Sequence, residues 1–284
     1  MRKIRVLRFK HLNFKNKKAL SFRKLKNTPP FIYMDKDKTY FPRLFEGLVS
    51  FLQVWNSKSK LTEDIFKADL YDYIEEAEIL SDIDVDPSIK TNVVNSIYII
   101  YSGDRNKFND FRGEIVEYLV VLLSKENKTK IYHEPEIKHK RDFLIQKQFL
   151  GRDCLIDVVN VHTRGHHIKL IECKADLDTQ FKSLNQRKKH NQKEIPFRKK
   201  INNMNYLANL LKNYQNENNE HIYIEKVFAA IKSPKRDIPS ICGDYKIVNL
   251  LHLLQDKSDQ GTLDYDIPFS KKLNFEPCPQ QRYF

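Results

Sequence analysis

Glycine is scarce in this chain of 284 residues, occurring at only 7 positions. Neither a GxxxxGK[ST] loop nor a GxGxxG pattern is present, which excludes the common glycine-rich loops that hold nucleotide phosphates. No apolar run reaches the roughly 18 residues that a membrane-spanning helix needs. The 4 cysteines form no CxxC pair or Cys/His cluster, which disfavours a structural zinc site. Without a secretory signal sequence, we expect reduced thiols in a cytoplasmic setting.

The composition indicates a folded, charged protein, with 40% hydrophobic and 31% charged residues. A net charge of +13 and a pI near 9.4 suit a polyanionic partner. Residues 1–26 hold eleven Lys and Arg and no acid, whereas residues 61–86 hold ten acids and one base. Each block is equally compatible with a solvated face, and the two blocks could pack together. The basic start also imitates a mitochondrial presequence, but its strand-like spacing and the lack of a cleavage site disfavour targeting.

Residues 1–105 are interpreted as an accessory region, because they contain no catalytic constellation. Helical spacing of apolar residues predicts helices over 44–55 and 62–80, the second capped by Thr62. The remaining segments of this region are predicted to be strands: 2–10, 19–25, a hairpin formed by 31–34 and 39–41, and 95–101.

Residues 106–235 are interpreted as an α/β (α+β) core, and residues 236–284 as an extension packed on it. The core begins with a helix capped by Asp110, and the extension contains a helix over 247–254. The other predicted elements of the core are strands over 131–137 and 142–149, a hairpin over 154–175, a helix over 197–213 and a strand over 222–231.

The hairpin places three charged residues on one patch. If Arg164 and Gly165 are the central turn residues, Asp157 falls opposite Glu172. Side chains alternate along a strand, so Lys174 shares their face. Charges within such apolar strands are costly unless a metal ion or substrate uses them. An exposed ion pair of Lys174 with Glu172 or Asp157 is the plain alternative. Asp153 stays open as a substitute for Asp157 if the turn slips by one residue, and Asp157 is preferred because apolar residues flank it.

The order of these elements, with Asp157 and Glu172-Cys173-Lys174 on the hairpin, resembles the PD-(D/E)xK nuclease superfamily over residues 109–232. The resemblance implies a restriction-endonuclease-like core, with a central mixed β-sheet flanked by helices. It also implies a Mg²⁺ (or Mn²⁺) site formed by Asp157, Glu172 and the backbone carbonyl of Cys173. Carboxylate oxygens suit these ions, and Mg²⁺ commonly uses only one or two carboxylates. Lys174 would orient or help to deprotonate the attacking water.

The superfamily often adds a glutamate from its first core helix. Glu117 is our first choice for this role and Glu114 is the reserve. The alternative is that these glutamates face solvent or pair with Arg112. Tyr206 lacks the glutamine four residues before it that RecB-like exonucleases carry, which weighs against an exonuclease.

Basic residues near the hairpin are candidates for contacts with a nucleic-acid backbone. An ordinary exposed charge run is an equally open interpretation. Histidines at positions 162, 166 and 167 lie at the turn, where a solvated or phosphate-contacting role is favoured over metal binding. The basic candidates are Arg164, Arg187, Lys188, Lys189, Lys199 and Lys200.

These observations predict a metal-dependent nuclease, most simply a DNA endonuclease of a prokaryotic antiviral defence or restriction system. A helicase or ATPase partner is expected, because the chain has no NTP-binding motif; related enzymes often act as homodimers. The alternatives are a Holliday-junction or repair nuclease, an RNA-cleaving toxin, and a non-catalytic nucleic-acid-binding module.

Overall fold

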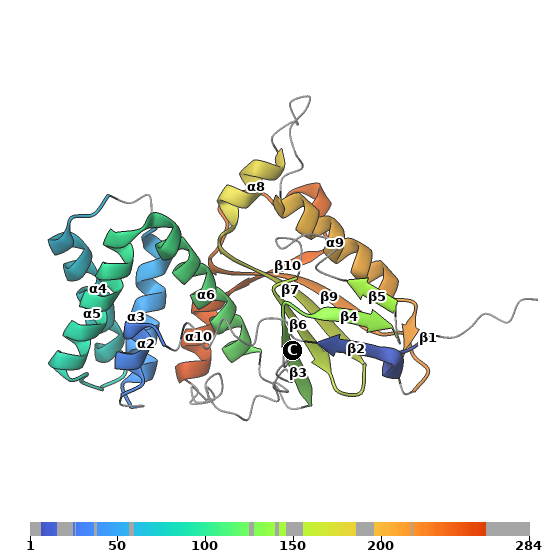
Figure 1. The fold of residues 1–284 in the computed structure, drawn as a ribbon, viewed down its shortest axis with the longest axis horizontal. Coiled ribbons are helices and arrows are strands. Elements are labelled where there is room, and N and C mark those ends of the chain that lie inside the picture. The colour runs from blue at the N-terminus through green and yellow to red at the C-terminus, as the bar shows by residue number, and fades with distance from the viewer. Residues whose placement is uncertain are drawn as a thin grey trace, which may run out of the picture.

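The computed structural model describes residues 7–15, 25, 27–36, 39–56, 60–124, 128–139, 142–145, 156–185, 196–216 and 218–259. These residues form a mixed α/β protein in which a helical layer lies beside a twisted sheet (Figure 1). The sheet has the strand order β10-β9-β7-β6-β3. Its strands are β3 (Thr129–His133), β6 (Val158–His162), β7 (His167–Asp176), β9 (Tyr223–Lys232) and β10 (Tyr245–Asn249).

The sheet is mixed, as predicted. Strands β3, β6 and β7 pair antiparallel, and β7, β9 and β10 pair parallel. A parallel pair needs a long crossover connection, and here α8 (Leu177–Asn185) and α9 (Pro196–Leu211) lie between β7 and β9. This crossover connection therefore places α9 against one face of the sheet.

Two hydrophobic clusters cover the two faces of this sheet. Ile171 and Cys173 of β7 belong to the cluster that includes α3 (Phe41–Val54), α6 (Arg105–Leu123) and α10 (Leu250–Asp259). Leu170 belongs to the other cluster, with apolar residues of α8 and α9. Because side chains alternate along a strand, Glu172 and Lys174 share the face that α9 covers.

The first 105 residues contribute helices to the first of these clusters. The buried residues of α3, α4 and α5 form one continuous apolar core with α6 and with Val158 of the sheet. Asp86 caps α5, its carboxylate accepting the N–H of Ser88 at 2.7 Å and of Ile89 at 3.3 Å. The bounds of the helices in this segment are α2 (Pro29–Met34), α3 (Phe41–Val54), α4 (Glu63–Ile79) and α5 (Pro87–Gly103). The accessory region thus shares its core with the sheet.

Shorter strands tie the amino-terminal segment to the rest of the chain. β1 (Leu7–Arg8) pairs parallel with β8 (Tyr214–Gln215). β2 (Leu12–Lys15) joins β4 (Glu136–His139) and β5 (Asp142–Ile145) in a three-stranded sheet. Two short 3-10 helices, Phe9–His11 and Ser240–Cys242, complete the described elements.

Several predicted strands are wrong. Residues 95–101 lie within α5, and residues 31–34 lie within α2. Phe41 begins α3, so the expected hairpin around residues 35–38 does not form. A short apolar run has no periodicity that separates a strand from a buried helix. Here the residues at the amino termini favour helices: Pro29 is the first residue of α2, and Asp86 caps α5, which begins at Pro87.

Other predicted boundaries are also corrected. Helix α6 begins six residues earlier than expected from an Asp110 cap, because Asp104 caps it by accepting the N–H of Asn106 at 2.8 Å. The helix expected over 247–254 begins at Leu250, where Asn249 accepts the N–H of Leu251 at 3.0 Å.

The strands expected over 2–10, 131–137 and 142–149 are shorter or broken. Only Leu7–Arg8 of the first is a strand, the second is interrupted at Glu134 with φ of 39°, and the third has its described strand over Asp142–Ile145. Of the strand expected over 19–25, all but residue 25 lies outside the described residues, as do parts of the first and third.

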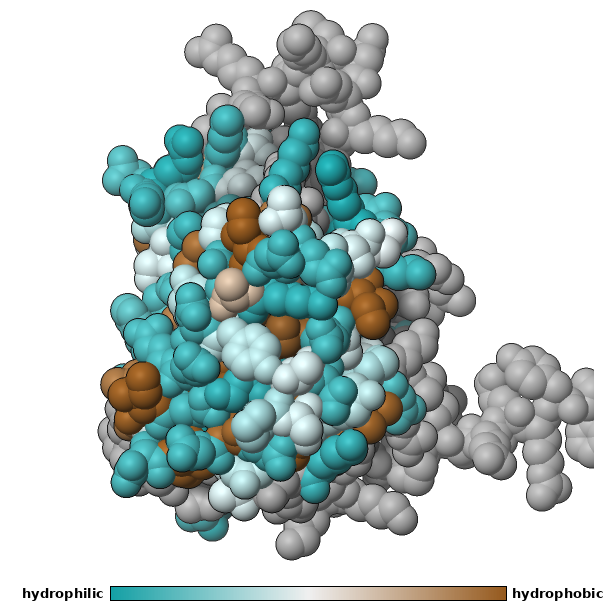
Figure 2. All heavy atoms as spheres, turned by 90° about the vertical axis from the view of Figure 1, so that its left-hand side faces the viewer, coloured by the Kyte–Doolittle hydropathy of each residue, from teal (hydrophilic) through white to brown (hydrophobic). Residues whose placement is uncertain are grey.

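The outer face of the helical layer is mostly hydrophilic (Figure 2). Apolar side chains on that face form small separate groups rather than one continuous patch. Single exposed apolar residues such as Ile79, Leu80 and Ile99 are normal on protein surfaces.

Candidate active site on the β6–β7 hairpin

The hairpin has the predicted register. Val158 pairs with Ile171 and Val161 with Ile168. Extending this register by one residue places Asp157 opposite Glu172. Gly165 has φ of +69°, a left-handed conformation that glycine adopts without strain. A Cβ atom at this position would also lie 2.4 Å from the ring of Phe9, so the turn requires glycine for two reasons.

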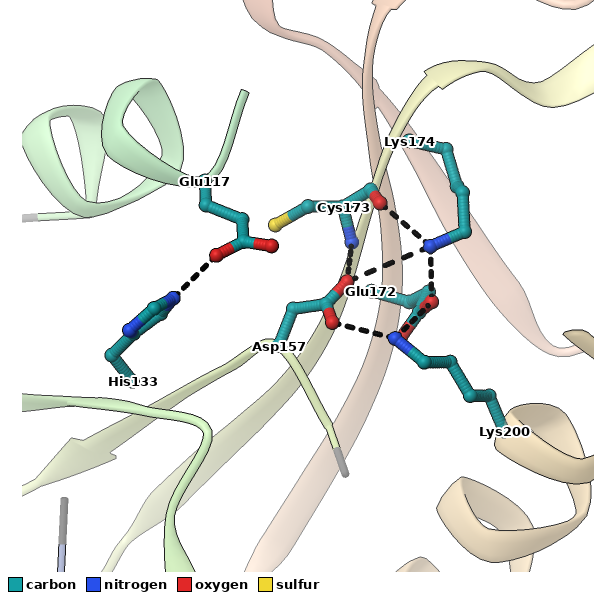
Figure 3. Close-up of polar contacts among 7 residues, drawn as sticks. All are labelled: Glu117, His133, Asp157, Glu172, Cys173, Lys174 and Lys200. Carbon is teal, nitrogen blue, oxygen red and sulfur yellow. Dashed lines mark hydrogen bonds and ion pairs between the residues drawn. The ribbon is translucent and has the colours of Figure 1, made fainter. Parts of the chain in front are cut away.

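The three predicted hairpin residues meet on the face covered by α9 (Figure 3). Asp157 is 3% exposed and Glu172 is fully buried. The Nζ atom of Lys174 donates to Glu172 Oε1 and, at 2.8 Å, to the carbonyl of Cys173. It lies 3.7 Å from Asp157 Oδ2, which accepts the N–H of Cys173 at 2.8 Å. Strand pairing therefore brings the two carboxylates and the ammonium into direct contact.

A second lysine enters the same cluster from α9. The Nζ atom of Lys200 lies 2.7 Å from Asp157 Oδ1 and 3.0 Å from Glu172 Oε1. Lys200 was expected among the residues that contact a nucleic-acid backbone, whereas the structure places it between the two carboxylates (Figure 3). Two ammonium groups now balance two carboxylates in a buried setting, so the cluster is formally neutral.

A signal for Lys200 was present in the sequence. Lys200 follows Phe197 by three residues and precedes Met204 by four, and both neighbours are buried. Residues three and four apart lie on one face of a helix. A lysine within an apolar stripe therefore points inward, toward whatever charge the stripe covers.

The charges of the cluster shift one another's proton affinities. Burial raises the pKa of Asp157, but the ammonium groups of Lys200 and Lys174 outweigh it and bring the pKa below its ordinary value. Burial, and then the charge of Asp157, raise the pKa of Glu172. Burial lowers the pKa of Lys174 and of Lys200, yet the carboxylates of Glu172 and Asp157 reverse this and raise both. Both lysines are therefore cations in this arrangement.

The donor atoms fit a hard divalent cation. Glu172 Oε2 is buried and accepts no hydrogen bond from the residues that the structure describes. A buried carboxylate oxygen without a partner is costly, and a cation is the partner that suits it. Asp157 and the carbonyl of Cys173 supply further oxygens around the Lys174 ammonium that contacts the other oxygen of Glu172. In the described part of the chain no three His, Cys, Asp or Glu side chains form a metal-binding group, but Mg²⁺ commonly uses only two carboxylates and keeps its waters.

Glu117 approaches from the opposite side of β7. It comes from α6, and its Oε2 atom lies 2.5 Å from Nε2 of the buried His133 (Figure 3). Its charge helps to raise the pKa of the Cys173 thiol, after burial and Asp157. The structure therefore places Glu117 beside the Cys173 side chain and His133. Glu114 is half-buried on the same helix.

Among the residues that the structure describes, the side chain of Arg112 hydrogen-bonds to the backbone of α3 rather than to Glu114 or Glu117. Its guanidinium donates to the carbonyl of Leu52 at 3.1 Å. Burial lowers the pKa of Arg112, and the charge of Asp176 opposes this. Arg112 thus links α6 to the end of α3.

The remaining predicted positions lie apart from the carboxylates or outside the described residues. Arg164, at the hairpin turn, and Lys199, on α9, are exposed. His166 Nδ1 lies 2.8 Å from Asn216 Nδ2, and His167 Nε2 lies 3.1 Å from Glu225 Oε2, at the turn end of the hairpin. Four positions fall outside the described residues: Asp153, Arg187, Lys188 and Lys189.

Comparison with known proteins finds no matching family model, no matching curated protein and no matching solved structure. Among the described residues, no helix is long and apolar enough to cross a membrane. The geometry of the hairpin site is therefore the observation that bears on function.

Proposed function

We propose that this chain is a metal-dependent nuclease that hydrolyses phosphodiester bonds, with DNA as its leading substrate. The observation that carries the proposal is the buried contact of Asp157, Glu172 and Lys174 on adjacent strands. A purely structural ion pair would satisfy its oxygens, whereas Glu172 Oε2 accepts no hydrogen bond from the described residues. The resemblance to PD-(D/E)xK nucleases assigns the same three residues.

Three oxygen donors would hold the cation: the carboxylates of Asp157 and Glu172 and the carbonyl of Cys173. A bound Mg²⁺ would acidify a water molecule and neutralise charge on the phosphate. Lys174 would orient the attacking water and stabilise negative charge, a role that suits a lysine with a raised pKa. The side-chain nitrogen of Lys174 already reaches the carbonyl and one carboxylate of this donor set.

The charge of the chain supports a nucleic-acid substrate. The net charge is +13, and phosphate contacts by Lys and Arg dominate nonspecific nucleic-acid affinity. Exposed Arg164 and Lys199 lie on the two elements that build the site, the hairpin and α9. By the resemblance, a defence or restriction role with a helicase or ATPase partner is part of this proposal.

Cleavage of supercoiled plasmid DNA tests the proposal. We expect Mg²⁺- or Mn²⁺-dependent nicking that EDTA prevents, and at least a 100-fold loss of rate in Lys174→Met, as is typical when a transition-state contact is removed. Lys107→Met, which changes an exposed lysine on α6, is the matched control and should keep the wild-type rate.

Parallel cleavage reactions with other nucleic acids identify the substrate class. Four-way junctions and structured RNA, incubated with the same Lys174→Met variant, distinguish a junction nuclease and an RNA-cleaving toxin from a DNA endonuclease. DNA binding with no metal-dependent cleavage of any of these substrates would contradict the proposal and favour a non-catalytic binding module.

A further inference from the structure

Lys200 holds the two carboxylates together in the way that a metal ion would. Its ammonium contacts one oxygen of each, Asp157 Oδ1 at 2.7 Å and Glu172 Oε1 at 3.0 Å. The second lysine, Lys174, contacts Glu172 Oε1 and the carbonyl of Cys173. Every oxygen donor assigned to the cation, apart from Glu172 Oε2, is thus engaged by an ammonium or a backbone N–H.

The ammonium of Lys200 and a divalent cation cannot both occupy the position between Asp157 Oδ1 and Glu172 Oε1. Both need the same lone pairs, and at contact distance their charges repel strongly in a buried setting where water screens little. Lys174 lies beside the donor set on the same strand as Glu172, which suits a residue that remains there. Lys200 reaches the site from a different element, so its ammonium can leave without disturbing the hairpin.

The packing of α9 allows such a movement of the side chain alone. Phe197, Ile201 and Met204 anchor this part of the helix in the apolar cluster beneath it. The side chain of Lys200 is 16% exposed, so part of it already lies at the protein surface. Lysine has a flexible four-carbon stem and a strongly hydrated head, which makes this exchange accessible.

We propose that Lys200 is an internal counter-cation that occupies the position between Asp157 and Glu172 and is displaced when a divalent cation binds there. This inference rests on the proposed metal-dependent function. It gives Lys200 a role distinct from that of Lys174: Lys200 holds the donor oxygens together beforehand, and its displacement opposes metal binding. The ammonium, once displaced, would add a positive charge near the site that nucleic-acid phosphates approach.

Titration of Mn²⁺ into EDTA-treated protein, with free Mn²⁺ measured by electron paramagnetic resonance, tests this role. We expect Lys200→Met and Lys200→Gln to bind Mn²⁺ about tenfold more tightly than wild type, because one competing charge is removed. Lys199→Met removes the neighbouring exposed lysine and should change the affinity much less. Equal or weaker Mn²⁺ binding by both Lys200 variants would overturn the inference.

The thermal unfolding temperature, measured with and without Mn²⁺, provides a second test that can be used even if a variant is less stable. Without a divalent cation, Lys200→Met should unfold at a lower temperature than wild type, because a buried carboxylate pair loses a counter-ion. Mn²⁺ should raise that temperature more in the variant than in wild type. Equal shifts in the two proteins would contradict displacement.

The outcomes separate this inference from the proposed function. If wild type binds Mn²⁺ and the Lys200 variants bind it no more tightly, only the inference fails. If neither wild type nor any variant binds Mn²⁺ at millimolar concentration, the proposed function fails, and the inference with it.

Discussion

Asp157 accepts a hydrogen bond from the backbone N–H of Cys173, with 2.8 Å between Oδ2 and N. The bond joins the residue just before β6 to the strand that carries Glu172 and Lys174. It leaves Asp157 Oδ1 for Lys200, at 2.7 Å. This carboxylate is therefore held by a backbone N–H at one oxygen and by an ammonium at the other.

Replacing Asp157 with asparagine should separate these two contacts. The amide oxygen can still accept the N–H of Cys173, but the charge that balances Lys174 and Lys200 is lost. Breaking a buried ion pair on one side typically costs about 3–5 kcal/mol. We expect Asp157→Asn to fold with reduced stability and to lose Mn²⁺ binding, measured by urea unfolding and metal titration. Unchanged Mn²⁺ affinity would exclude Asp157 as a ligand.

Cys173 offers the opposite test, because only its backbone oxygen belongs to the proposed donor set. Its thiol is buried, and burial raises the thiol pKa well above the ordinary value. Cys173→Ala should keep plasmid cleavage within about twofold of wild type and cost about 1 kcal/mol of stability through the lost thiol packing. Complete loss of cleavage in a folded Cys173→Ala protein would show that the side chain acts in the reaction.

Glu117 distinguishes a direct metal ligand from a supporting group. Its carboxylate faces His133 at 2.5 Å, on the α6 side of β7. We expect Glu117→Gln to reduce cleavage by less than tenfold and to leave Mn²⁺ affinity near wild type, whereas Glu172→Gln should abolish both. A loss of Mn²⁺ affinity in Glu117→Gln as large as that in Glu172→Gln would instead make Glu117 a ligand.

The raised pKa of Lys200 predicts how its contribution to stability depends on pH. A lysine whose pKa is higher in the folded state stabilises the fold fully below its unfolded value of 10.5. That contribution is lost as pH rises through the folded pKa. The stability difference between wild type and Lys200→Met should therefore be constant from about pH 7 to pH 9 and shrink above 10.5, measured by urea unfolding. A difference that grows in the alkaline range would contradict this assignment.

The hairpin could be predicted from the sequence because its register depends only on residues that are close together in the chain. Strand alternation and a short turn at Arg164-Gly165 determine that Asp157, Glu172 and Lys174 share a face, and the observed register agrees. Apolar spacing likewise located α4 and α9 within a few residues. Such patterns depend only on neighbours in the chain.

The partners of Lys200 and Glu117 could be identified only from the tertiary structure. The ammonium of Lys200 meets Asp157 only because the crossover lays α9 against that face of the sheet. Glu117 pairs with His133 because α6 covers the other face. The prediction of a strand over 95–101 was wrong because a short apolar run is compatible with either a strand or a buried helix. In the structure this run lies in α5, whose amino terminus is capped by Asp86.

The most direct test is a crystal structure of the protein soaked in Mn²⁺, with anomalous scattering recorded at the manganese edge. We expect a single strong anomalous peak bridging the carboxylates of Asp157 and Glu172, close to the carbonyl of Cys173, with the side chain of Lys200 turned away. Absence of manganese at this position, with Lys200 still joining the two carboxylates at millimolar Mn²⁺, would contradict the central claim.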